Sequence, residues 1–187
     1  MSFEHDKSQF LKKPDKSFAR EIDKDILQLV RKINKAPYYY TTSSCAGRIV
    51  LMPETGKKQE KIFSAIFHEK VNIDYLKKCL PRKPIIFLIY LKHEPCIMHV
   101  ACKDIEHANM LVNLARQSGW KKSGIISIKP EKIMCELVST EILACPIMNK
   151  GEFVVSDDYL KILVNECNKK LVHTREKIRK LEKAFKP

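Results

Sequence analysis

Glycine is scarce in this sequence, which has only five glycines among its 187 residues. None of them belongs to a GxGxxG dinucleotide-binding fingerprint or to a glycine-rich phosphate-binding loop. The sequence therefore excludes the cofactor loop of a standard Rossmann domain. Any nucleotide-like cofactor has to be bound by another kind of fold.

Disulfide and metal-binding patterns are also lacking. The seven cysteines are odd in number and irregularly spaced, and no two of them form a Cys-x-x-Cys pair. Four lie in apolar, strand-like runs, where we expect small buried thiols: Cys96, Cys102, Cys135 and Cys145. We predict no metal site and a reducing compartment.

Long hydrophobic runs are absent. The longest, Ile85–Leu91, is far too short to span a bilayer. The N-terminal residues MSFEHDKSQF are charged and lack an apolar core, so they predict no signal peptide. We expect a cytoplasmic protein that does not bind membranes.

Positive charge, in contrast, is abundant. The formal net charge is +13 and is spread along the chain rather than confined to a tail. Such a charge favours a folded surface with a positive face and an anionic partner, nucleic acid more readily than membrane. The alternative interpretation is a lysine-rich surface that contacts only solvent.

The apolar pattern predicts an α+β fold. Helical spacing and capping residues indicate helices over about Ser17–Asn34, from Asn72, over Asp104–Ser118 and from Ser156. Strand patterns cover Tyr38–Thr42, Arg48–Met52, Lys61–His68, a hairpin of PIIFLIYLK and CIMHVACK across His93–Pro95, and the runs SGIISI, KIMCELV and EILACPIM. We therefore predict a mixed, largely antiparallel sheet with flanking helices, and the two strand–strand–helix passages suggest an internal duplication.

The last helix carries a continuous apolar stripe. Its members alternate at spacings of four and three residues: Leu160, Val164, Cys167, Leu171, Thr174, Ile178, Leu181 and Phe185. Such a stripe is usually a face packed on the same chain and less often a dimer seam. We predict one catalytic domain over residues 1–150, a long helix over 151–187 that packs on it or extends from it, and a monomer.

The stretch SSCAGR is the first candidate site, because small polar residues stand there between two strand patterns. Ser43 and Ser44 offer hydroxyl groups, and Gly47 allows a close backbone approach or a positive φ. Arg48 presents a planar fork of donors that suits a carboxylate or a phosphate, and it could activate the Cys45 thiol. The alternative is a hairpin turn followed by a surface arginine.

Two further groups are candidates. His68 and His99 each lie in an apolar strand pattern, where an imidazole could act as a general base or contact a nucleobase. Trp120, Lys121 and Lys122 resemble a stacking surface with phosphate contacts, although a core tryptophan between solvated lysines has the same pattern.

Several motifs together resemble one known family. These are YYTTSSCAGRI, FHEKV and the long run LKHEPCIMHVACKDIEHANMLVNLARQSGWKKSGI. They are similar to the wybutosine-synthesis tRNA methyltransferases, and the resemblance extends from about Phe10 to Ile147. One departure is Phe67, where the family often has a tryptophan whose indole N–H is missing here.

The resemblance implies transfer of a methyl group from S-adenosylmethionine to a ring nitrogen of a tricyclic guanosine derivative beside the anticodon of phenylalanine tRNA. Since no Rossmann loop exists, Ser43, Ser44, Cys45, Gly47 and the pair Ser123–Gly124 are expected to line the cofactor pocket. We expect Arg48 to hold either the methionine carboxylate or the amino-acid side chain of the substrate. His68 or His99 would accept the proton, and Lys121, Lys122 and Trp120 would contact RNA.

Two functions of other classes stay open at this point. One is a non-catalytic RNA-binding module that uses the same basic surface. The other is an assembly protein that binds a partner through the stripe on its last helix.

Overall fold

The computed structural model describes residues 2–12, 22–54, 63–81 and 86–186. The chain folds into two compact units and passes between them four times. Unit 1 consists of Met1–Ala46, Pro95–Thr140 and Thr174–Pro187, and unit 2 consists of Gly47–Glu94 and Glu141–His173.

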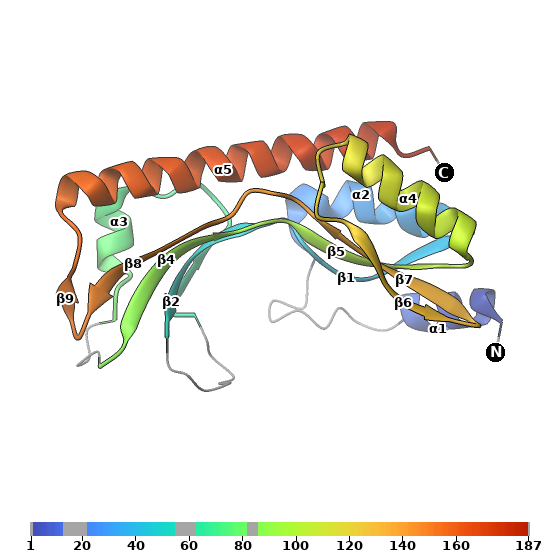
Figure 1. Cartoon of the computed structure of the whole chain (residues 1–187), viewed down its shortest axis with the longest axis horizontal. Coiled ribbons are helices and arrows are strands. Elements are labelled where there is room, and N and C mark those ends of the chain that lie inside the picture. The colour runs from blue at the N-terminus through green and yellow to red at the C-terminus, as the bar shows by residue number, and fades with distance from the viewer. Residues whose placement is uncertain (1, 13–21, 55–62, 82–85, 187) are drawn as a thin grey trace. The chain divides into compact units, whose positions relative to one another are not determined.

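Unit 1 contains a four-stranded antiparallel sheet in the order β1-β5-β7-β6. The strands are β1 (Tyr39–Cys45), β5 (Ile97–Cys102), β6 (Gly124–Lys129) and β7 (Lys132–Val138). Its helices are α1 (Phe3–Leu11), α2 (Lys24–Lys35), α4 (Ile105–Gln117) and the C-terminal part of α5 (Asp157–Ala184). Figure 1 shows α2 and α4 on one face of this sheet and α1 on the other.

Strand alternation divides the side chains of unit 1 between these two faces. Val100 of β5 and Cys135 of β7 pack in the main core with residues of α2, α4 and α5. Ala101, which points to the other face, packs with Tyr40 and with Phe3 of α1. The main hydrophobic core therefore lies between the sheet and the helices α2, α4 and α5, and α1 packs on the opposite face.

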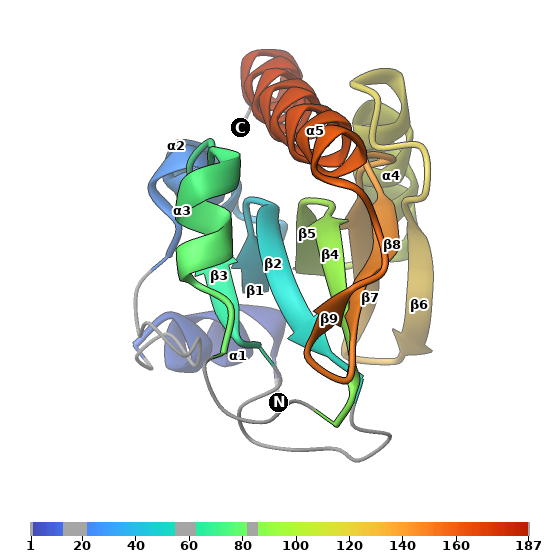
Figure 2. The same ribbon diagram turned by 90° about the vertical axis from the view of Figure 1, so that its left-hand side faces the viewer.

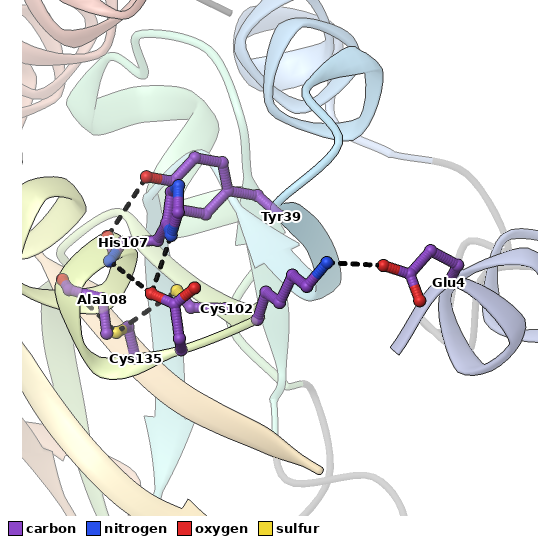
Figure 3. Close-up of polar contacts among 8 residues, drawn as sticks. Glu4, Tyr39, Cys102, His107, Ala108 and Cys135 are labelled. Carbon is purple, nitrogen blue, oxygen red and sulfur yellow. Dashed lines mark hydrogen bonds and ion pairs between the residues drawn. The ribbon is translucent and has the colours of Figure 1, made fainter. Parts of the chain in front are cut away.

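The start of α4 is tied to the sheet by polar contacts (Figure 3). The Asp104 carboxylate accepts from the backbone N–H of His107 and also lies 2.7 Å from its ring Nδ1. The Tyr39 hydroxyl donates to the His107 carbonyl at 3.1 Å. Beneath the helix the sulfur atoms of Cys102 and Cys135 are 3.6 Å apart, and the neighbouring sulfur together with burial raises the pKa of the Cys102 thiol. Cys102 is therefore a protonated core residue at neutral pH.

Unit 2 contains a five-stranded antiparallel sheet in the order β3-β2-β4-β8-β9. The strands are β2 (Arg48–Pro53), β3 (Ala65–Phe67), β4 (Leu88–Glu94), β8 (Leu143–Asn149) and β9 (Glu152–Phe153), and α3 is Ile73–Lys78. One core joins this sheet to Leu76 of α3 and to Leu160 and Leu171 of α5. Figure 2 shows both helices on the same face of the sheet.

Most predicted elements are confirmed, including the largely antiparallel α+β class. The side chains of Asn72 and Asp104 accept the expected capping hydrogen bonds, and Ser156 accepts from the Tyr159 N–H at the start of α5. Gly119 ends the α4 region with a φ of 97°. The helix α1 and the short strand β9 were not predicted, and the suggested internal duplication stays a prediction.

The predicted hairpin of PIIFLIYLK with CIMHVACK is wrong. The strand β4 pairs with β2 and β8 in unit 2, whereas β5 pairs with β1 and β7 in unit 1. Both edges of each strand are therefore used by partners distant in sequence. Apolar alternation revealed the strands, but it carries no information about which strands pair.

The start of the second helix also differs from the prediction. Within the described residues this helix begins at Lys24, and Asp23 occupies its N-cap position. The proposed cap Ser17 and the apolar Phe18 lie outside the described residues, as do Lys61 and Ile62 of the third predicted strand.

The stripe along α5 is buried within the chain. Its first four members belong to the core of unit 2, and Ile178, Leu181 and Phe185 belong to the main core of unit 1. This burial favours intramolecular packing over a dimer seam. The domain boundary at residue 150 stays a prediction. No helix in the described ranges is both long and apolar enough to cross a bilayer.

The packing of α5 leads to a stability prediction. Leu171 is 3% exposed, so Leu171→Ala should lower the free energy of unfolding by about 2–5 kcal/mol. Ile162 on the same helix is 57% exposed, and Ile162→Ala should change it by less than about 0.5 kcal/mol. Urea unfolding followed by circular dichroism measures both values. A midpoint that rises with protein concentration would contradict intramolecular packing.

Candidate active site

The segment Ser43–Cys45 is part of a strand rather than a loop. The strand β1 continues through Cys45, and Ser43, Ser44 and Cys45 lie opposite His99, Met98 and Ile97 of β5. The predicted interruption of the strand is therefore wrong, because β5 supplies hydrogen-bonding partners that the local sequence does not reveal. A bulge between Thr41 and Ser43 is the one irregularity in this pairing.

Four residues form a row across the sheet of unit 1. Ser43 pairs with His99, His99 with Glu136, and Glu136 with Gly124, so all four strands contribute one residue. The Ser43 Oγ lies 2.8 Å from His99 Nδ1, and the Glu136 Oε1 lies 3.0 Å from His99 Nε2. By strand alternation this row shares the face of Ala101, opposite the main core.

These two contacts determine which nitrogen of His99 carries the proton. An ionised Glu136 can only accept, so Nε2 is the protonated nitrogen of a neutral ring. Nδ1 is then the acceptor for the Ser43 hydroxyl. The His99 side chain is 27% exposed and Ser43 is exposed, so both are accessible to a ligand.

Gly124 leaves open space at the end of the row. A Cβ atom built on this glycine would meet no other heavy atom within 4 Å. Its neighbour Ser123 is different, because it is buried and its hydroxyl donates to the Trp120 carbonyl and accepts from the Val138 N–H. Ser123 is therefore a structural residue, which corrects its assignment to the cofactor pocket, whereas Gly124 remains a candidate.

Trp120 does not form a stacking surface. Its side chain is fully buried in unit 1, and its Nε1 donates to the Lys177 carbonyl at 3.1 Å. The indole cannot reach a nucleobase from the core, so the prediction that it contacts RNA is wrong. Lys121 and Lys122 next to it are exposed, and their contact with RNA stays a prediction.

Gly47 and Arg48 belong to unit 2. Gly47 is buried with a φ of 80°, a conformation that favours glycine. The Arg48 Nε lies 2.8 Å from the Glu94 carboxylate, and its guanidinium lies 4.5 Å from the centre of the Phe63 ring. Since β2 pairs with β3 and β4 and not with β1, the alternative of a hairpin turn at SSCAGR is wrong.

His68 also belongs to unit 2 and follows the last residue of β3. It is exposed, so the expected position within a strand is not confirmed. Phe67, the departure from the family pattern, is buried and packs edge-on against Tyr75 at 5.9 Å. This aromatic residue is part of the core of unit 2.

The structure thus brings together three of the predicted residues, Ser43, His99 and Gly124. It adds Glu136, which the sequence analysis missed. The signal for it was an acidic residue within the otherwise apolar strand pattern KIMCELV. Among the described residues no three His, Cys, Asp or Glu side chains gather as a metal site.

Comparison with known proteins gives consistent results. The family described as Methyltransferase TYW3 matches residues 5–187. A Thermococcus sibiricus protein named tRNA(Phe) 7-((3-amino-3-carboxypropyl)-4-demethylwyosine(37)-N(4))-methyltransferase is 39% identical over 163 residues, which are 86% of this chain and 82% of that protein. The human tRNA wybutosine-synthesizing protein 3 homolog is 32% identical over 182 residues, which are 92% of this chain and 68% of that protein.

Solved structures share the fold. The PH1069 protein from Pyrococcus horikoshii superimposes with a TM-score of 0.86 at 32% identity, covering 97% of this chain and 93% of that one. A hypothetical protein from Aeropyrum pernix superimposes with a TM-score of 0.74 at 26% identity, covering 87% of this chain and 99% of that one.

Proposed function

The chain belongs to the TYW3 methyltransferase family, and we propose that it methylates a ring nitrogen of the tricyclic 4-demethylwyosine-type nucleotide next to the anticodon of phenylalanine tRNA. The family match over residues 5–187 supports the reaction class. The names of its relatives, at 32–39% identity over most of the chain, support the substrate.

The observation in the structure that carries this proposal is the row Ser43–His99–Glu136. Methylation of a ring nitrogen requires a group that accepts one proton from that nitrogen. His99 has a hydroxyl group within hydrogen-bonding distance of one ring nitrogen and a carboxylate within the same reach of the other, so a proton accepted on one side is stabilised from the other. We assign proton acceptance to His99 rather than to His68.

The methyl donor we propose is S-adenosylmethionine, which supplies an electrophilic methyl group on a sulfonium. The residues present suit such a ligand. Ser43 offers a hydroxyl group, and Gly124 leaves open space beside the row. Ser44 points to the other face of β1, opposite Met98, and stays a candidate from the sequence. Cys45 follows these serines in unit 1 and stays a candidate for this pocket, and Gly47, the first residue of unit 2, stays a candidate from the sequence. We propose Arg48 for an acid group of the donor or of the substrate, because its guanidinium suits a carboxylate.

Proton transfer follows from the hydrogen bonds of the row. Transfer of the methyl group would form the N–C bond as the C–S bond of the sulfonium breaks and leaves a neutral thioether. The proton on the substrate nitrogen passes to the Ser43 oxygen while the Ser43 proton moves to His99 Nδ1. The resulting imidazolium is stabilised by the Glu136 carboxylate 3.0 Å from Nε2. The protein otherwise aligns the reactants, and alignment by itself is worth up to about 7–11 kcal/mol.

We propose that the basic surface of the protein binds the phosphates of the tRNA. The net charge of +13 suits a polyanion, and phosphate contacts position a nucleic acid without specifying its sequence. We propose Lys121 and Lys122 for such contacts. We still predict that the protein is a monomer and that it is located in the cytoplasm.

The direct test is transfer of labelled methyl from S-adenosylmethionine to phenylalanine tRNA that carries the unmethylated tricyclic nucleotide. We expect label at that nucleotide and none on tRNA with an unmodified guanosine. Tight tRNA binding without transfer, and without binding of S-adenosylmethionine, would instead indicate a non-catalytic RNA-binding module.

We predict that Arg48→Ala weakens binding of S-adenosylmethionine or raises the KM for tRNA by about ten- to a hundredfold, because it removes a charged hydrogen bond. The ion pair with Glu94 is partly exposed, so the free energy of unfolding should fall by less than about 1 kcal/mol. Titration calorimetry and steady-state kinetics measure these effects. Arg179→Ala, at an exposed arginine of α5, is the control, and unchanged constants in Arg48→Ala would refute the role.

We predict that His99→Ala lowers kcat by about 100- to 10,000-fold, the usual contribution of a general base. His99→Asn should be impaired to a similar extent, because an amide cannot accept the proton. His107→Asn is a matched control, because it disrupts another imidazole–carboxylate pair outside the row. Equal losses of kcat in the two variants would contradict a specific role for His99.

We predict that Lys121→Glu/Lys122→Glu weakens tRNA binding at every sequence and lowers the salt slope of log Kd by about one or two units. The control Lys70→Glu/Lys78→Glu makes the same charge change at two exposed lysines of unit 2. Filter binding between low and moderate salt measures both. An equal loss of tRNA affinity in the two double variants would show that the lower net charge causes it, and not the loss of RNA contacts by Lys121 and Lys122.

A further inference from the structure

Ala46 is the first of the two residues between the end of β1 at Cys45 and the start of β2 at Arg48. It is fully buried, although its peptide has no partner in the pairing of either strand. Its N–H donates to the Asp23 Oδ2 at 2.7 Å, and its carbonyl accepts from the Arg175 Nη1. Two side chains from other elements therefore replace the missing strand hydrogen bonds.

Asp23 makes this contact instead of capping its own helix. It occupies the N-cap position of α2, yet its side chain makes no capping hydrogen bond. The N-terminal residues of the other described helices, Ser2, Asn72, Asp104 and Ser156, all accept from a backbone N–H of the first turn. A cap usually stabilises by about 1 kcal/mol, so its absence at α2 leaves the carboxylate available for Ala46.

Arg175 binds the carbonyl of the Ala46 residue. Its side chain is only 12% exposed, and its Nε lies 2.7 Å from the Asp25 Oδ2 in the first turn of α2. The planar guanidinium thus binds a carboxylate with one nitrogen and the Ala46 carbonyl with another, which the single ammonium of a lysine cannot reproduce in the same geometry. We name these four residues the Ala46 clamp: Asp23, Asp25, Ala46 and Arg175.

Within the Ala46 clamp, Ala46 itself lies three residues after Ser43, the serine of the row Ser43–His99–Glu136. Among the residues that the structure describes, β1 is an edge strand, because it pairs with β5 alone in the sheet of unit 1. Its pairing is also interrupted by the bulge before Ser43. Between that bulge and the end of the strand, the position of Ser43 depends on three residue pairs with β5 and on the attachment of Ala46.

We propose that Asp23 and Arg175 are positioning residues for methyl transfer, which hold the Ala46 peptide and thereby keep the Ser43 hydroxyl on His99. This inference rests on the proposed function for its kinetic consequence. The structural consequence, a displaced Ser43 and an altered His99 hydrogen bond, does not depend on it.

The kinetic test separates positioning from stability. Asp23→Ala should lower kcat by about tenfold to a hundredfold, since small displacements of reacting groups cost this much, with the KM for tRNA within a factor of about two. Asp23→Asn keeps a side-chain oxygen that can accept from Ala46, so it should retain most of the wild-type kcat. Arg175→Lys should resemble Asp23→Ala.

Asp104→Ala is the matched control. It removes an aspartate that does cap its helix, so it should lower the melting temperature without changing kcat. If Asp23→Ala has the wild-type kcat, or if Asp104→Ala loses as much, Asp23 is not a positioning residue.

A second readout needs no activity. In ¹⁵N-labelled protein, Asp23→Ala should accelerate hydrogen exchange at the Ala46 amide and shift the His99 ring nitrogen resonances, whereas Asp104→Ala should leave both unchanged. Unchanged His99 resonances in Asp23→Ala would overturn the inference. An inactive wild-type enzyme with the expected shifts would instead count against the proposed function and leave the clamp supported.

Discussion

The pairing of β5 with β1 on one side and β7 on the other is the constraint on which unit 1 depends. It buries Val100 and its neighbours under three helices and, by alternation, turns His99 to the opposite face. The same register places Ser43 and Glu136 on either side of that imidazole. A shift of β1 by one residue would bury the hydroxyl and disrupt the core together, so the stability of the sheet also maintains the row.

Small and polar residues near the row fall into two groups with different roles. Ser123 and Trp120 are buried and use their polar atoms within unit 1, where they join the end of α4 to β7 and α5. Ser43 and Glu136 remain accessible and direct their polar atoms to a single imidazole. Burial and hydrogen bonding separate the structural residues from the candidate catalytic ones, although their residue types are alike.

Much of the fold could be predicted from local patterns. Asn72, Asp104 and Ser156 marked helix starts, because capping depends on residues within one turn. Strand pairing could not be predicted in this way. The sequence predicted a hairpin of β4 and β5, which are adjacent in sequence but belong to different sheets. It also predicted an interruption at Ser43–Cys45, which in the structure pair with β5. The candidate site was predicted in part, since Ser43, His99 and Gly124 were identified and Glu136 was not.

The sequence by itself determined the α+β class, the absence of a Rossmann loop, the basic character and the family resemblance, because these depend on composition, short-range periodicity and motifs. Only the tertiary structure decided that His99 lies between a hydroxyl and a carboxylate and that Trp120 is a core residue. It also decided that the Asp23 carboxylate accepts a hydrogen bond from the Ala46 N–H and does not cap its own helix. Each of these facts joins residues more than 20 positions apart or depends on burial, and such relations arise only when the strands and helices pack.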